Sequence, residues 1–261
     1  MSQYNQIGLN EEIDFTTGSA VLHESGSLKL WLRKEKNYLE MVSVNNPGSK
    51  SKTPPPKSLW KKWMVSEDPV KLSFLPHVPD LPVQIAFPEP LIVPAGKTIQ
   101  FYYWLPSWIS VRLGKQQDLS LGEFPSQPMS HTWMGNFFDG ELVYEDFPAV
   151  HFSPEFSESF IFICPVEVKN KAAESLVLEK MLIRVNNLSV YSDGNYFWLN
   201  KMIFDYGKGN ELLDVRLPNA LPKDLGKFTL VAKAINPDRK SLLLKTFTPI
   251  LMKNTLILPN K

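Results

Sequence analysis

Residues 98–106 read TIQFYYWLP, and their alternation decides the fold class of this chain. One set of alternate residues is apolar: Ile99, Phe101, Tyr103 and Leu105. The other set is mixed: Gln100, Tyr102 and Trp104. A period of two places the sets on opposite faces of an extended strand, so the stretch predicts a β-strand with one buried face.

The second face of this strand has two alternatives. Tyr102 and Trp104 either pack beneath another layer or form an open platform of the kind that stacks on sugars and bases. Packing is the favoured alternative, because aromatic residues are enriched in strands for their fit to pleated surfaces. Together with Trp108, which starts the next extended segment, these residues are candidate contacts for a ligand or a partner.

Further strand-like segments lie on both sides of this stretch. Their ranges are 27–34, 38–44, 70–75, 82–87, 108–113, 140–147, 159–170, 175–185, 188–192, 196–206, 211–217 and 227–235. Asp193-Gly194 is the strongest hairpin signal between them. This spacing predicts a mainly β protein with two β-sandwich-like lobes, immunoglobulin-like or jelly-roll-like, at 1–150 and 151–261. The capping residues Asn-Pro-Asp at 236–238 predict a short C-terminal helix.

Residues 45–63, NNPGSKSKTPPPKSLWKKW, interrupt the pattern with three consecutive prolines and no acidic residue. Proline excludes a central strand or a helix interior, so a long loop is expected. Its lysines form a candidate basic patch for nucleic acid, an acidic partner or a membrane surface: Lys50, Lys52, Lys57, Lys61 and Lys62. The favoured alternative is a solvated loop that Trp60 and Trp63 anchor onto the sheets.

Composition argues against several functional classes. The chain has 261 residues and a formal net charge of +1, so no global field draws nucleic acid or anionic lipid. The single cysteine, Cys164, lies in the apolar run FIFICPVEV and is expected to be a core residue. The first residues have neither a basic start nor an apolar stretch, and no run approaches a membrane span, so a cytoplasmic location is expected.

The segment 130–147, SHTWMGNFFDGELVYEDF, is the densest mixture of polar, aromatic and glycine residues in the chain. Its two glycines flank an expected turn, where glycine permits a tight hairpin or the close approach of a ligand. His131, Trp133 and Asp139 are therefore candidate ligand or partner contacts.

Motifs for catalysis and metal binding are missing. The four histidines show no HxH or HExxH spacing and lie near no cysteine pair, so no metal is expected. Neither GxSxG nor GxxxxGK[ST] occurs, so the sequence encodes neither a serine elbow nor a phosphate loop. No cofactor and no catalytic residue is assigned.

Four segments carry a resemblance: FPEPLIVP (87–94), LPSWISVRLG (105–114), WMGNFFDGELVYEDF (133–147) and the run from Pro165 to Tyr206. Their order resembles an uncharacterised prokaryotic family, domain-of-unknown-function family 432, over roughly residues 80–215. The resemblance implies a mostly β protein without transmembrane segments. It implies no activity, substrate or catalytic residue, and the 45–63 segment does not resemble a core element of the family.

The leading functional hypothesis is a non-enzymatic cytoplasmic binding or protein-interaction module, whose partner is an unknown protein or small-molecule ligand. The alternative is a carbohydrate-active or other ligand-processing enzyme. It requires Trp104, Trp108 and Trp133 to be exposed around two close carboxylates, because glycosidase carboxylates sit within about 10 Å of each other. A third hypothesis is contact with nucleic acid or a membrane surface through Lys50–Lys62.

Overall fold

The computed structural model describes residues 4–48, 51–117, 119–135, 137–138, 140–147, 150–154, 160–208, 211–218, 221 and 226–236. These residues form twenty strands in four sheets and two single-turn 3-10 helices, η1 (Lys57–Leu59) and η2 (Val185–Asn187). The predicted mainly β class is confirmed. The C-terminal helix predicted from residue 236 onward lies outside the described residues.

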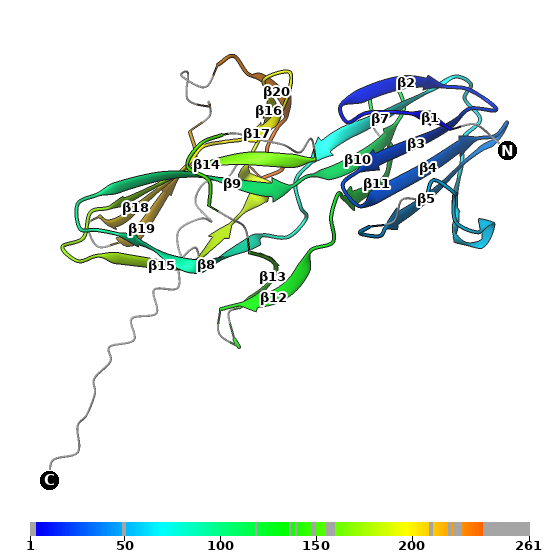
Figure 1. Ribbon diagram of the computed structural model, residues 1–261. Coiled ribbons are helices and arrows are strands. Elements are labelled where there is room, and N and C mark those ends of the chain that lie inside the picture. Colours follow the sequence, from blue (N-terminus) through cyan, green and yellow to red (C-terminus); the bar gives the residue numbers. More distant parts are fainter. Residues whose placement is uncertain are drawn as a thin grey trace, which may run out of the picture.

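The first lobe contains two sheets (Figure 1), and side chains of both sheets belong to one hydrophobic cluster. The first sheet has the order β1 (Asn5–Gln6), β3 (Ala20–Ser25), β4 (Leu28–Lys34), β5 (Tyr38–Asn45), β6 (Lys61–Met64). The second has the order β11 (Leu119–Pro125), β10 (Trp108–Leu113), β7 (Val70–His77), β2 (Glu11–Phe15). Leu28, Leu30 and Leu32 of β4 enter this cluster, while Trp31 faces a separate small one, as the alternation of 27–34 predicts.

The second lobe contains the other two sheets, which share a larger cluster. The third sheet has the order β12 (Ser130–Met134), β13 (Glu141–Asp146), β8 (Val83–Val93), β15 (Leu176–Ile183). The fourth has the order β19 (Glu211–Arg216), β18 (Met202–Lys208), β14 (Ile161–Asn170), β17 (Phe197–Leu199), β16 (Val190–Ser192), β20 (Thr229–Ala232), with β9 (Thr98–Pro106) on the other side of β14. The hairpin predicted at Asp193-Gly194 is the β16–β17 pair.

The quoted strand, β9, has the buried face that its alternation predicts. It pairs antiparallel with β14 along its whole length, so that Tyr103 lies opposite Cys164 and Phe101 opposite Val166. These side chains belong to the cluster of the second lobe. Only Ser107 separates β9 from β10, so the chain passes here from the second lobe into the first (Figure 1).

Strand pairing does not follow the expected division at residue 150. β8 pairs with β15, and β9 pairs with β14, so strands on both sides of that boundary build the second lobe. β10 and β11 instead complete the first lobe beside β7. The expected division assumed that each lobe is continuous in sequence. Residues 78–106 contribute to the second lobe before the chain returns to the first, which local patterns do not reveal.

The 45–63 segment is a long loop only in part, because Lys61–Met64 forms β6 and pairs with β5. Trp60 is 8 % exposed, its Nε1–H donates to the Pro55 carbonyl at 3.1 Å, and the Arg33 guanidinium lies 4.0 Å above its ring. Trp60 therefore anchors the segment to the first sheet, as the favoured alternative predicts.

The strands β11 and β12 lie within residues 114–138, where the sequence predicts no strand, because polar residues interrupt the apolar pattern of each.

Candidate functional site

The second face of β9 is packed at Tyr102 and Trp104. Trp104 stacks on His151 with ring centroids 3.6 Å apart and ring planes 7° from parallel. The Tyr102 N–H donates to the His151 carbonyl at 2.7 Å, and the Tyr102 ring meets Trp198 edge to face at 6.5 Å. Burial lowers the pKa of His151, which favours the neutral imidazole against the indole. These contacts correspond to the packed alternative.

Trp108 is also enclosed, since it is 7 % exposed and lies in the cluster of the second lobe, with its ring 5.8 Å from that of Tyr144. The enzyme alternative requires this indole at the surface, so the described residues do not form the arrangement that it needs.

The described carboxylates of the 130–147 segment are already engaged. Arg184 donates two hydrogen bonds to Glu141, at 3.1 and 2.5 Å, and the Tyr103 hydroxyl donates to Asp146 at 2.7 Å. Asp139 lies outside the described residues. The engaged carboxylates therefore serve as structural contacts of the second lobe.

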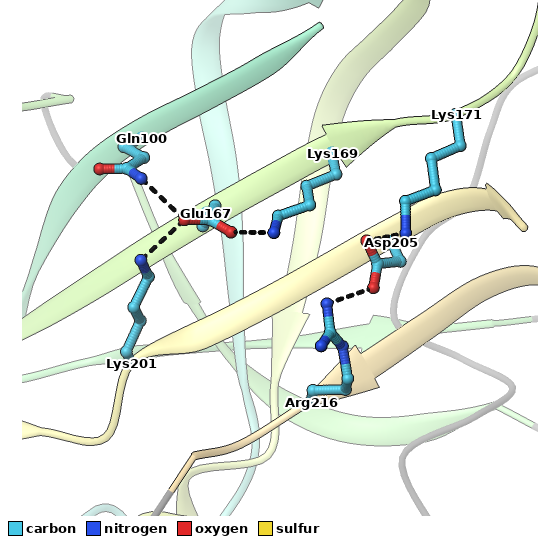
Figure 2. Close-up of polar contacts among 7 residues, drawn as sticks. All are labelled: Gln100, Glu167, Lys169, Lys171, Lys201, Asp205 and Arg216. Atoms are coloured by element: carbon cyan, nitrogen blue, oxygen red, sulfur yellow. Dashed lines mark hydrogen bonds and ion pairs between the residues drawn. The ribbon is translucent and has the colours of Figure 1, made fainter. Parts of the chain in front are cut away.

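Beyond Tyr102 the same face of the fourth sheet becomes charged (Figure 2). Glu167 on β14 accepts hydrogen bonds from Gln100 and Lys201, and it pairs with Lys169; each of these distances is 2.7 Å. The strand register brings Gln100 directly opposite Glu167.

A second buried carboxylate lies on the neighbouring strand. Asp205 on β18 pairs with Lys171 at 2.8 Å and with Arg216 at 2.6 Å. Its side chain is fully buried, whereas those of Lys171 and Arg216 are 39 % and 49 % exposed. The acids are therefore more deeply buried than the cations around them, and Figure 2 shows which cations pair with each acid. Each acid is paired with two cations, so we interpret the cluster as a structural network of ion pairs in the fourth sheet.

Low pH is expected to destabilise the second lobe, because Glu167 and Asp205 lose their negative charge when they are protonated. Burial alone would raise the two pKa values, but the ion pairs outweigh burial and the pKa of each carboxyl lies below its ordinary value. Such a group stabilises the fold fully above its unfolded pKa of about 4, and this contribution is lost as the pH falls through the lower folded value.

The free energy of unfolding, measured with urea at a series of pH values, should therefore fall from about pH 5 downward. The slope should be shallower in the Glu167→Gln/Asp205→Asn variant. An identical slope in the variant and the wild type would contradict this assignment.

The 130–147 segment forms the β12–β13 hairpin, whose base is anchored in the second lobe. Tyr144 packs in the core and donates its hydroxyl to Asp80 at 3.0 Å. Burial and then Asp80 raise the pKa of Tyr144 to about 12, so the phenol stays protonated at neutral pH. On the opposite face, Val143 and Met134 pack with Leu182 of β15. The base of the hairpin is therefore held in place on both faces.

Four described side chains in the outer part of the hairpin are apolar and exposed. Trp133 lies opposite Leu142 in the register, so both side chains occupy one face, and they are 55 % and 48 % exposed. At the tip, Phe137 and Phe138 are 89 % and 94 % exposed and meet edge to face at 5.5 Å. We call these four residues the apolar overhang.

Sequence reasoning found Trp133, and His131 beside the overhang, but missed the other three residues of the overhang. His131 is exposed on the same face, with its ring 4.7 Å from Tyr144. The signal for Phe137 and Phe138 was available: two adjacent phenylalanines within a short turn cannot both reach the core beneath the hairpin. Tyr102, Trp104 and Trp108 are not part of the overhang.

Two of the described lysines of the 45–63 segment are paired with acids. Lys52 pairs with Glu24 at 3.3 Å, and Lys62 pairs with Glu40 at 3.0 Å. Lys61 and Lys62 are neighbours in β6 and so point to opposite faces. Lys57 lies in η1, and Lys50 lies outside the described residues. Acidic partners thus offset part of the positive charge on which the nucleic-acid and membrane hypothesis depends.

A cleft of about 240 Å³ lies between the lobes, where Val231 and Ala232 of β20 approach β7 and β10. Arg112 in its lining donates to Ser110 at 2.8 Å and pairs with Glu123 at 3.3 Å. The charges in this cleft offset each other, so it does not favour an anionic or a cationic ligand.

The part of the chain that the structure describes offers little support for a metal site, a reactive thiol or a membrane-spanning helix. It contains no group of three or more metal-ligating side chains placed to hold an ion. Burial raises the pKa of the Cys164 thiol, which is a core residue as predicted. The helices described are single turns, and none has the length and apolarity that a membrane crossing requires.

Comparison with protein families matches residues 11–253 to a family described as "Protein of unknown function (DUF432)". The chain belongs to the DUF432 family. The DUF432 match extends beyond the 80–215 range of the resemblance and includes the 45–63 segment. It also includes strands of both lobes and the apolar overhang. A search of curated proteins and a search of solved structures each returned no match.

Proposed function

We propose that this DUF432 protein is a non-enzymatic binding module of the cytoplasm that docks a partner protein on the apolar overhang. The observation that carries the proposal is the exposure of four large apolar side chains on one hairpin with an anchored base. Large apolar side chains exposed close together in the chain are typical of interaction sites. Its aromatic composition is typical of the few residues that dominate binding energy.

The anchored base supports this role physically. A hairpin that is held in place loses little conformational freedom on binding, so more of the energy of covering its apolar surface contributes to affinity. Covering apolar surface releases roughly 25 cal/mol per Å². The expected occupant is therefore a partner protein that presents a complementary apolar surface.

We also infer that each lobe is a β-sandwich. The support is that the first and second sheets contribute to one hydrophobic cluster, and the third and fourth sheets to another. Parallel pairs such as β8–β13 and β14–β18 differ from the wholly antiparallel sheets of immunoglobulin domains. We therefore propose the sandwich architecture without the immunoglobulin topology.

The cytoplasmic location is supported by the single buried cysteine, which suits a reducing compartment.

The test is capture of a partner by the purified full-length chain, followed by titration of the purified partner. The Phe137→Ala/Phe138→Ala variant should bind at least about 30-fold more weakly, because hot-spot aromatic residues contribute about 2 kcal/mol or more. The matched control is Ile92→Ala/Val177→Ala, a cross-strand pair of exposed apolar residues on β8 and β15.

The control variant should bind like the wild type. Unchanged affinity in the phenylalanine variant, at an unchanged unfolding temperature, would contradict docking on the overhang.

A further inference from the structure

We infer that the outer edge of β12 pairs with the same edge of a second copy of this chain, forming a two-fold dimer. This goes beyond the proposed function, because it concerns a strand edge and needs no other protein. The sheet order places β12 at one end of the third sheet, and no described strand pairs with its outer side. Such an edge presents unpaired N–H and C=O groups to an approaching strand.

The other edge strands of the described sheets carry features that hinder such pairing. β1 is two residues long, and β6 carries two adjacent lysines. β2 and β19 contain acidic residues, and the ladders of β11, β15 and β20 each contain a register shift. The outer side of β9 is occupied at Tyr102 by the segment that carries His151. Charge, brevity and irregularity are the usual protections of sheet edges.

β12 has none of these protections. Its sequence, SHTWM, contains no lysine, arginine, acid or proline, and its register with β13 is unbroken over all five residues. The edge is therefore regular and carries no acidic or strongly basic side chain, and no strand among the described residues pairs with it.

A second copy fits this edge because the uncharged strand meets itself without like-charge repulsion. Antiparallel pairing about a two-fold axis at Thr132 sets His131 opposite Trp133 of the second copy. Cross-strand aromatic pairs of this kind stabilise sheets. The pairing uses the same edge in both copies, so assembly closes at two and does not continue as a fibre.

The test is the mass of the purified full-length chain by sedimentation equilibrium. At high micromolar concentration the wild type should have twice the chain mass of 29.8 kDa. Thr132→Lys or Thr132→Glu alone sets like charges opposite each other and should weaken dimerisation at least about ten-fold. An equimolar mixture of the two variants should restore the dimer, because a lysine then faces a glutamate.

Two further variants keep the inference testable if a charge at residue 132 impairs folding. Thr132→Cys should form a disulfide-linked dimer on oxidation, whereas Ser120→Cys on the exposed edge strand β11 should not; Cys164 is buried and does not compete. A wild type that stays monomeric would overturn the inference. So would folded charge variants whose mixture does not dimerise, or an absence of the Thr132→Cys cross-link. Docking on the apolar overhang is tested by a different measurement, the partner titration with the Phe137→Ala/Phe138→Ala variant. A failure of the dimer and a failure of the docking site can therefore be told apart.

Discussion

Replacing Lys171 and Arg216 together with methionine is expected to lower the free energy of unfolding by about 3 kcal/mol. The Asp205 side chain, which is fully buried in the wild type, would then lack its cations. An unpaired charge in a low-dielectric interior is costly, and the usual loss is about 3–5 kcal/mol. The low end applies here because both cations are partly exposed, so water can reach the space that they leave.

The matched control for this variant is Asp205→Asn, which removes the buried charge and leaves the cations. Because Lys171 and Arg216 can be hydrated where they lie, the expected loss is only about 1 kcal/mol. The triple variant, Lys171→Met/Arg216→Met/Asp205→Asn, should therefore be more stable than the Lys171→Met/Arg216→Met variant, which would show coupling between the acid and its cations. Urea unfolding measures all three. Equal losses of unfolding free energy in the Asp205→Asn variant and the Lys171/Arg216 variant would contradict the burial of the acid beneath its more exposed cations.

Phe101→Ala is expected to lower the free energy of unfolding by about 3–5 kcal/mol. Phe101 is 2 % exposed and meets Phe87 edge to face, with ring centroids 5.9 Å apart. Truncation removes the buried ring and leaves a cavity between the third and fourth sheets, since the two rings come from β9 and β8. Both the lost burial and the cavity reduce stability. Thermal or urea unfolding gives the measurement.

Ile92→Ala is the control for this second prediction, because Ile92 is an apolar strand residue that is 64 % exposed. Its replacement should change stability by no more than about 0.5 kcal/mol. A Phe101→Ala variant as stable as the Ile92→Ala variant would mean that the alternation of the quoted strand does not report its buried face.

Much of the local structure could be read directly from the order of residues. The alternation of β4 and β9 identified the faces that enter the two cores, and Asp193-Gly194 identified a hairpin. Trp60 was expected to anchor the lysine-rich segment, and its indole does so. Such features depend on neighbours in the chain, since side-chain parity and turn conformation are set by a few consecutive residues.

The candidate site was predictable only in part. The 130–147 segment was identified by its composition, and Trp133 by its aromatic side chain. Periodicity alone does not tell how far a hairpin extends beyond the sheet beneath it. Phe137 and Phe138 are exposed because they lie at the tip, while the base of the same hairpin is packed on both faces.

Sequence by itself determined that this is a mainly β chain, which faces of its strands are apolar, and where several turns lie. Tertiary structure alone decided that β9 pairs with β14 and β8 with β15. It also decided that Glu167 and Asp205 share one face with their cations, and that β12 is an end strand of the third sheet among the described residues. The physical reason is that alternation records the environment of a strand's faces, whereas the partner along each edge depends on which distant segments bury their apolar faces together.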